Sequence, residues 1–168
     1  MSDTDTLSNA PVSVLIADGD PLICRALARL LGNSTDVEVI ATSADRIEAL
    51  ELVDQLRPAV ALVDAHMALP DGMSATEALR GRRPATQIII LGVYEALREE
   101  ALRAGACRFL LKDGGRAALV DAIQLAAAGR CEVGSDNTGE RDSLGSVSVA
   151  TKRLDAPPEP RQSQGRQI

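Results

Sequence analysis

The chain has 168 residues, of which 45% are hydrophobic and 25% are charged, and its formal net charge is −6. This length and balance are typical of one globular domain with a hydrophobic core. The acidic charge and the near absence of aromatic residues exclude a general nucleic-acid surface, which needs basic side chains or aromatic stacking faces. No apolar run approaches the ~18 residues of a membrane span and no stretch resembles a signal peptide, so we expect a cytoplasmic protein.

The chain has three cysteines, Cys24, Cys107 and Cys131, which lie far apart in the sequence. Their number is odd and no C-x-x-C spacing occurs, which argues against a disulfide framework or a zinc site. Free cysteine is commonly buried as a small hydrophobic side chain. We therefore expect three reduced thiols, with a redox pair or a zinc site as the less favoured alternative.

The first half of the chain contains two strand–helix units and a third strand. Apolar, β-branched runs predict strands over residues 12–17, 37–42 and 59–64. Asp20 is the expected N-cap of the first helix, which ends at Gly32, and Ser43 is the expected N-cap of the second helix, which ends at Arg57. The apolar stripes expected to face the core are Ile23, Leu27, Leu30 and Leu31, then Ile47, Leu50, Val53 and Leu56.

The second half continues the alternation of helices and strands. Residues 65–73 predict a loop, and Ser74 with Glu77 forms an expected capping box for a short helix that ends near Gly81. Two further strands are expected over residues 86–92 and 107–112, and two further helices over residues 95–104 and 115–129. Their expected core stripes are Leu97, Ala101 and Ala104, then Leu119, Val120, Ile123 and Ala127.

The alternation predicts an α/β domain with five parallel strands and helices on both faces of the sheet. Right-handed crossovers and a domain of about 120 residues favour the flavodoxin-like strand order 2-1-3-4-5. We place this domain at residues 11–133, between a disordered N-terminus (1–10) and a tail (134–168) whose Gly, Ser, Pro and Gln content predicts disorder.

Three side chains of chemical interest follow strand ends in this arrangement: Asp18 after the first strand, Asp64 at the end of the third and Lys112 at the end of the fifth. Ligands of such sheets bind at the carboxyl ends of the strands where the winding reverses, so we expect these side chains to meet. Two carboxylates and an ammonium suit Mg²⁺ and a phosphoryl group, and a carboxylate can itself be phosphorylated. A capped turn at Asp64 and a solvated strand end at Lys112 are the alternatives.

Four stretches carry a resemblance to a known family: VLIADGDPLICRAL, PAVALVDAHM, IIILG and GACRFLLKD, with Gly72 eight residues after Asp64. Together they resemble the receiver domain of two-component response regulators, particularly the receivers attached to LuxR/NarL-type regulators. The resemblance covers residues 11–133 and implies a CheY-like fold, here without the DNA-binding domain of those relatives.

Residue by residue, the resemblance implies that Asp64 accepts a phosphoryl group, that Asp18 and Asp64 help to bind Mg²⁺, and that Lys112 contacts the phosphoryl group. It also implies a main-chain Mg²⁺ ligand at the carbonyl of His66 and an aromatic switch at Phe109. The lone His66 is otherwise expected to be a solvated loop residue.

The chain departs from the family pattern at three positions. Gly19 stands where the family has a second metal-binding acid, Gly92 where it has a switch hydroxyl, and Ala68 where it has a proline. Mg²⁺ is therefore expected to bind weakly or not at all unless Asp20 replaces the missing acid, although Asp20 is better explained as the helix cap.

The resemblance implies a phosphorelay receiver, not an enzyme, supplied by a histidine kinase or a small phosphodonor. The departures at Gly19 and Gly92 leave open a pseudo-receiver that acts through protein partners or a small ligand. A homodimer, or a heterodimer with a full-length regulator through residues 95–128, is a further expectation. The acidic chain is not expected to bind DNA or a membrane, and a hydrolase on the same fold is the weakest alternative.

Overall fold

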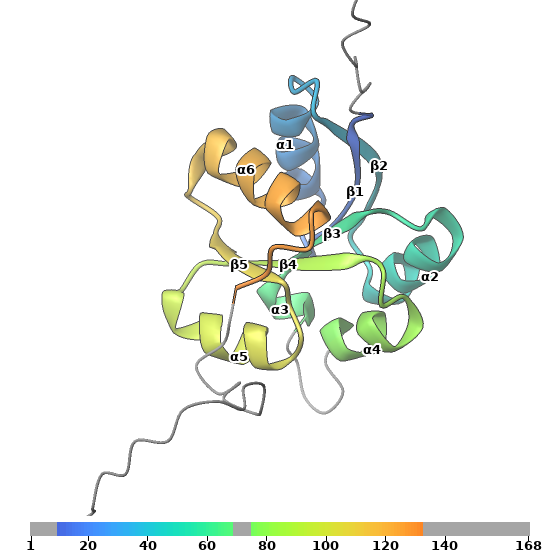
Figure 1. The fold of residues 1–168 in the computed structure, drawn as a ribbon, viewed down its shortest axis with the longest axis vertical. Helices are drawn as coiled ribbons and strands as arrows, with labels where there is room; N and C mark the ends of the chain where they lie inside the picture. The colour runs from blue at the N-terminus through green and yellow to red at the C-terminus, as the bar shows by residue number, and fades with distance from the viewer. Residues whose placement is uncertain (1–9, 69–74, 133–168) are drawn as a thin grey trace, which may run out of the picture. The chain divides into compact units, whose positions relative to one another are not determined.

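The computed structural model describes residues 10–68 and 75–132, and five parallel strands form one sheet in this part of the chain (Figure 1). The strands are β1 (Val12–Ala17), β2 (Val37–Ser43), β3 (Val60–Asp64), β4 (Gln87–Gly92) and β5 (Arg108–Leu111). Their order, β2-β1-β3-β4-β5, confirms the predicted fold class. The predicted N-terminal segment, apart from Ala10, and the predicted tail lie outside the described residues.

Helices cover both faces of the sheet. They are α1 (Pro21–Leu31), α2 (Arg46–Leu56), α3 (Ala65–Ala68), α4 (Ala75–Arg82), the 3-10 turn η1 (Glu95–Leu97), α5 (Arg98–Arg103) and α6 (Gly115–Ala127). Buried residues of α1 and α6 pack on one face, and buried residues of α2, α3, α4 and α5 pack on the other. Figure 1 shows α1 and α6 on the side of the sheet opposite α3, α4 and α5.

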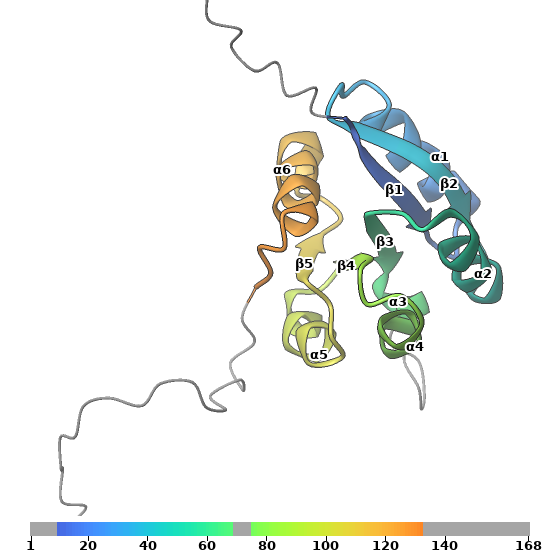
Figure 2. The ribbon, with the colours of Figure 1, turned by 45° about the vertical axis from the view of Figure 1, so that its right-hand side comes forward.

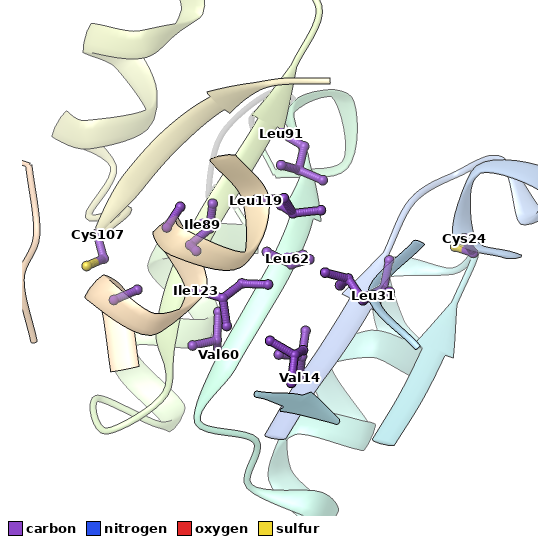
Figure 3. Packing of buried hydrophobic residues seen from close by; sticks show 14 residues of the cluster. Val14, Cys24, Leu31, Val60, Leu62, Ile89, Leu91, Cys107, Leu119 and Ile123 are labelled. Atoms are coloured by element: carbon purple, nitrogen blue, oxygen red, sulfur yellow. The ribbon is translucent and has the colours of Figure 1, made fainter. Parts of the chain in front are cut away.

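The strand alternation divides the core into two layers. In β1, Val14 and Ile16 face α1 and α6, whereas Leu15 and Ala17 face the other helices. This division follows from the pleat, which turns successive side chains to opposite faces. Figure 3 shows the first layer, in which residues labelled on α1 and α6, such as Leu31 and Ile123, pack onto the central strands. Burial on both faces explains why the strands are almost continuously apolar.

The predicted start of α2 is wrong in one detail. Asp45, and not Ser43, is the N-cap, because its carboxylate accepts hydrogen bonds from the backbone N–H groups of Ile47 and Glu48. Ser43 instead ends β2, where its hydroxyl lies 2.8 Å from the Asp45 carbonyl and 2.5 Å from a carboxylate oxygen of Glu48. By contrast, the predicted cap at Asp20 is confirmed, with the Leu22 N–H 2.8 Å from its carboxylate.

Several predicted core positions are exposed, and small residues take their place. Ile47 and Leu56 in α2 are 65% and 44% exposed, and Leu30 in α1 is 37% exposed. The buried residues of these helices include the smaller side chains of Ala49 and Cys24. In α5 and α6, Ala104 and Val120 are only partly buried and Ala127 is exposed, whereas Ala122 and Ala126 are buried. Because interiors are close-packed, small side chains on these helices also fill core positions, and a stripe drawn from large side chains misses them.

The segment after β3 forms a short helix, α3, where the sequence predicts a loop. The predicted capping residue of the next helix, Ser74, lies outside the described residues. That helix, α4, runs through the expected end at Gly81 and ends at Arg82.

The prediction of three reduced thiols is also wrong. Cys107 and Cys131 form a disulfide, with a Cα–Cα separation of 4.4 Å, and only Cys24 is free. The reason is topological, because a helix that follows a parallel strand runs back to the level at which the strand began. The end of α6 thereby returns the chain to the start of β5, as Figure 2 shows beside the β5 label.

Candidate functional site

The carboxyl ends of β1, β3 and β5 bring together the three side chains that the sequence singles out. Asp18 follows β1, Asp64 is the last residue of β3, and Lys112 follows β5. The Lys112 Nζ lies 2.6 Å from Oδ2 of Asp18 and 2.7 Å from Oδ1 of Asp64. Both acids are nearly fully buried, at 3% and 5% exposure. One ammonium is therefore shared by two buried carboxylates.

Backbone groups hold the other oxygen of each carboxylate. The Asp20 N–H donates to Oδ1 of Asp18, and the His66 N–H donates to Oδ2 of Asp64, both at 3.0 Å. Oδ1 of Asp64 differs from these oxygens because it is buried and accepts no hydrogen bond of good geometry from the described residues. Its nearest charge is Lys112, in an ion pair. This oxygen is thus the least satisfied acceptor of the site.

Lys112 is held in its charged form. Burial alone would lower its pKa, but the contacts with the Asp18 and Asp64 carboxylates outweigh that effect and raise the pKa above the ordinary value of 10.5. A lysine ammonium is a compact cation with three donors. Two carboxylates and one ammonium leave the cluster with one net negative charge, which favours a further cation.

The donor set fits a hydrated magnesium ion. Mg²⁺ is commonly held by one or two carboxylates and keeps several waters, so Asp18 and Asp64 meet the minimum. The only described partner of Oδ1 of Asp64 is the Lys112 ammonium, so this oxygen has lone-pair capacity left for a cation. In residues 10–68 and 75–132, however, no three His, Cys, Asp or Glu side chains gather as a metal site. Lys112 already neutralises part of the charge that would attract the ion.

The residues around Asp18 and Asp64 determine whether the chain offers a further metal ligand. A Cβ built on Gly19 meets no atom within 4 Å among the described residues, so the place of the missing family acid is open space. The Asp20 carboxylate is occupied by the Leu22 N–H as a helix cap. The side chain of His66 is exposed, so the described contact of this residue with the site is its backbone N–H.

Gly92 and Phe109 lie in direct contact. A Cβ on Gly92 would lie 2.5 Å from Cζ and 2.7 Å from Cε2 of the Phe109 ring, which is fully buried. Arg98 covers the ring with its guanidinium carbon 5.2 Å from the ring centre, and its Nη1 donates to the Phe109 carbonyl at 3.2 Å. The absence of a side chain at position 92 therefore makes room for the ring.

Two contacts of the site escaped the sequence analysis. The Cys24 thiol lies 3.4 Å from the backbone carbonyls of Asp18 and Ser43, and burial raises its pKa, so it is a protonated donor beneath the site. Arg98 caps Phe109 from a neighbouring helix. No sequence signal marks either contact, because each joins residues of different secondary-structure elements, and their separations of 6, 19 and 11 residues match no periodic spacing.

Comparison with known proteins gives one consistent relationship. Residues 14–124 match the profile of the response regulator receiver domain. The chain is 36% identical over 121 residues to the nitrate/nitrite response regulator protein NarP of Escherichia coli, covering 71% of this chain and 56% of NarP. It is 31% identical over 120 residues to the transcriptional regulatory protein DegU of Brevibacillus brevis, covering 70% and 51%. The chain thus spans about half the length of these curated relatives.

Solved structures agree with this match. The signal receiver domain of NarL from Mycobacterium tuberculosis superposes with a TM-score of 0.65 at 34% identity, covering 71% of this chain and 98% of that domain. A LuxR-family two-component response regulator from Aurantimonas sp. SI85-9A1 superposes with a TM-score of 0.65 at 28% identity, covering 75% and 91%.

None of the helices in the described part of the chain has the length and apolar character needed to cross a bilayer.

Proposed function

Since this chain belongs to the response regulator receiver domain family of two-component signalling, we propose that Asp64 accepts a phosphoryl group, with Asp18 and Lys112 as its partners. The observation that carries the proposal is the Lys112 ammonium held within 2.7 Å of both carboxylates at the carboxyl ends of the strands. The phosphodonor is proposed to be a histidine kinase or a small acyl phosphate.

The proposed step is a displacement at phosphorus. A carboxylate oxygen of Asp64 supplies the electron pair of the new O–P bond, the bond from phosphorus to the donor breaks, and the leaving group departs with its electron pair. Lys112 is placed to move from Asp64 Oδ1 to the incoming phosphoryl oxygens, because it already spans the gap between the acids. The Asp64 Oδ2 hydrogen bond from His66 fixes the orientation of the nucleophile.

Asp18, Asp64 and the His66 carbonyl are the groups proposed to hold Mg²⁺, which when bound supplies positive charge to the transferring phosphoryl group. The chain itself compensates part of the charge through Lys112. Because Gly19 supplies no carboxylate and Asp20 is engaged as a cap, we propose that the affinity for Mg²⁺ is lower than a third acid would give.

A second candidate, a pseudo-receiver that acts without phosphorylation, is favoured by the contact between Gly92 and Phe109. A hydroxyl at position 92 is absent, and the Phe109 ring fills the space beside it. In this alternative, the chain acts through partner binding or a small ligand. Its proposed partner is a second copy or a full-length regulator, bound through the face of α5, β5 and α6.

The test is phosphorylation by acetyl phosphate with Mg²⁺, measured as an added phosphoryl mass on the intact chain. The wild type and Asp113→Asn, which removes an exposed acid beside Lys112, are expected to gain one phosphoryl group. Asp64→Asn is expected to gain none. If the folded wild type gains no mass, the phosphorylation proposal is wrong and the pseudo-receiver remains. If Asp64→Asn gains as much as the wild type, Asp64 is not the acceptor.

A further inference from the structure

The disulfide ties the last described segment of the chain to the start of β5. Cys107 precedes β5 and is 2% exposed, whereas Cys131 lies after α6 and is exposed. The backbone N–H of Glu132 donates to the Cys107 carbonyl at 2.8 Å, and Nη1 of Arg108 donates to the Arg130 carbonyl at 2.7 Å. Residues 130–132 therefore lie against β5, as Figure 2 also shows.

Glu132 extends this attachment to α5. Its carboxylate lies 2.5 Å from Nη1 of Arg98 and 3.8 Å from Nε of Arg108. That Nε is buried and makes no hydrogen bond to the described residues, so Glu132 supplies the nearest negative charge. Only 23% of the Glu132 side chain is exposed, which weakens the screening of these ion pairs by water.

Arg98 connects Glu132 to the Phe109 ring beside the site. The same Nη1 that contacts Glu132 donates to the Phe109 carbonyl at 3.2 Å, and the guanidinium lies over the Phe109 ring. The ring in turn fills the space at Gly92, the last residue of β4. One continuous set of contacts thus leads from the disulfide through Glu132 and Arg98 to Phe109.

We propose that Cys107 and Cys131 are a redox-modified pair that controls the position of Phe109, an arrangement called the latch below. The disulfide holds Glu132 on Arg98 and thereby fixes Phe109. Reduction by a dithiol releases Glu132, Arg98 and Phe109 from these contacts. The inference does not depend on phosphorylation of Asp64. In this proposal the redox state of two cysteines controls the α5–β5 face. A side chain at position 92 plays no part, because Gly92 has none.

The chemistry of the latch is thiol–disulfide exchange. A thiolate of the dithiol attacks Sγ of the exposed Cys131, forming a mixed disulfide while the S–S bond breaks and Cys107 leaves as a thiolate. The second thiol of the reductant then attacks the reductant's other sulfur, which is bonded to Cys131 in the mixed disulfide, and Cys131 leaves as a thiolate. Two electrons and two protons pass from the dithiol to the protein, and the reductant becomes a disulfide. Burial of Cys107 directs the first attack to Cys131.

Phe109 provides a direct readout because it is the only phenylalanine in the chain. Full-length protein grown with 4-fluorophenylalanine therefore gives one fluorine resonance, which reports the surroundings of the ring. Oxidised protein is compared with protein reduced by dithiothreitol, and alkylation under denaturing conditions counts the thiols in each sample. We expect one thiol before reduction and three after it, together with a shift or broadening of the resonance on reduction.

Three variants separate the latch from general effects of reduction. Cys24→Ser removes the free thiol and is expected to keep the redox response. Cys131→Ser is expected to show the reduced resonance under both conditions. Glu132→Gln keeps the disulfide but removes the carboxylate that pairs with Arg98, and its resonance is expected to move away from the oxidised position with the disulfide intact.

Three results would overturn the proposal. Three alkylated thiols in protein treated with an oxidised dithiol would mean that the pair does not form a disulfide. An unchanged fluorine resonance on reduction, with the disulfide shown to open, would mean that the pair does not act on Phe109. An unchanged resonance in Glu132→Gln would mean that the Glu132–Arg98 ion pair does not connect the disulfide to Phe109.

Discussion

The ring of Phe109 occupies the space in which any side chain at position 92 would begin, with two ring carbons 2.5 and 2.7 Å from a Cβ built on Gly92. Neither residue can therefore be changed without regard to the other. The contact connects the end of β4 to β5 at the edge of the candidate site.

Gly92→Ser is expected to lower the free energy of unfolding by about 1–3 kcal/mol, because the buried ring must leave its position. Urea unfolding measures this change. Combining Gly92→Ser with Phe109→Leu removes the clash, so the double variant is expected to lose less than the sum of the single losses. Gly81→Ser is the control, since its Cβ meets no atom within 4 Å in the described structure. A purely additive double variant would show that the steric contact is not the cause.

Gly19→Asp is expected to tighten Mg²⁺ binding by roughly tenfold or more, because it adds a carboxylate beside two existing ones. The open space around the Gly19 Cβ admits the new side chain without displacing described neighbours. Titration of Mg²⁺ by calorimetry measures the affinity, and Gly19→Asn, of similar size but uncharged, is the matched control. Equal affinities of the Asp and Asn variants would contradict a role for the missing charge.

Lys112→Gln is expected to destabilise the fold by about 3–5 kcal/mol, because Asp18 and Asp64 lose the charge that neutralises them in a buried site. Mg²⁺ is expected to restore part of this loss, and to raise the unfolding midpoint of the variant more than that of the wild type. Lys112→Arg keeps the charge and is expected to lose less. A variant that Mg²⁺ stabilises no more than the wild type would rule out competition between Lys112 and the ion.

The stability of the wild type is expected to fall at high pH for the same reason. Contacts with Asp18 and Asp64 raise the pKa of Lys112 against the opposing effect of burial, so its contribution is fully present below 10.5, the ordinary lysine pKa. That contribution is lost as pH rises through the higher pKa of the folded protein. Urea unfolding from about pH 9 to about pH 11.5 measures the difference between wild type and Lys112→Gln. The difference is expected to shrink with pH; a constant difference would exclude the ion pairs as its source.

The sequence by itself determined the order of the five strands, the sheet topology and the meeting of Asp18, Asp64 and Lys112, although it did not predict helix α3. These features follow from local rules, because apolar runs, caps and the geometry of parallel sheets place the strand ends at one edge. The roles proposed for these residues remain for the experiments above.

Only the tertiary structure decided how segments distant in the chain fit together. The pairing of Cys107 with Cys131, the position of Arg98 over Phe109 and the filling of the space at Gly92 depend on helix placement and packing in three dimensions. Spacing along the chain does not encode such contacts, because each depends on where a returning helix meets the sheet and on the volume left by neighbouring side chains. The sequence shows that position 92 lacks a side chain, and the packed core shows which ring takes its place.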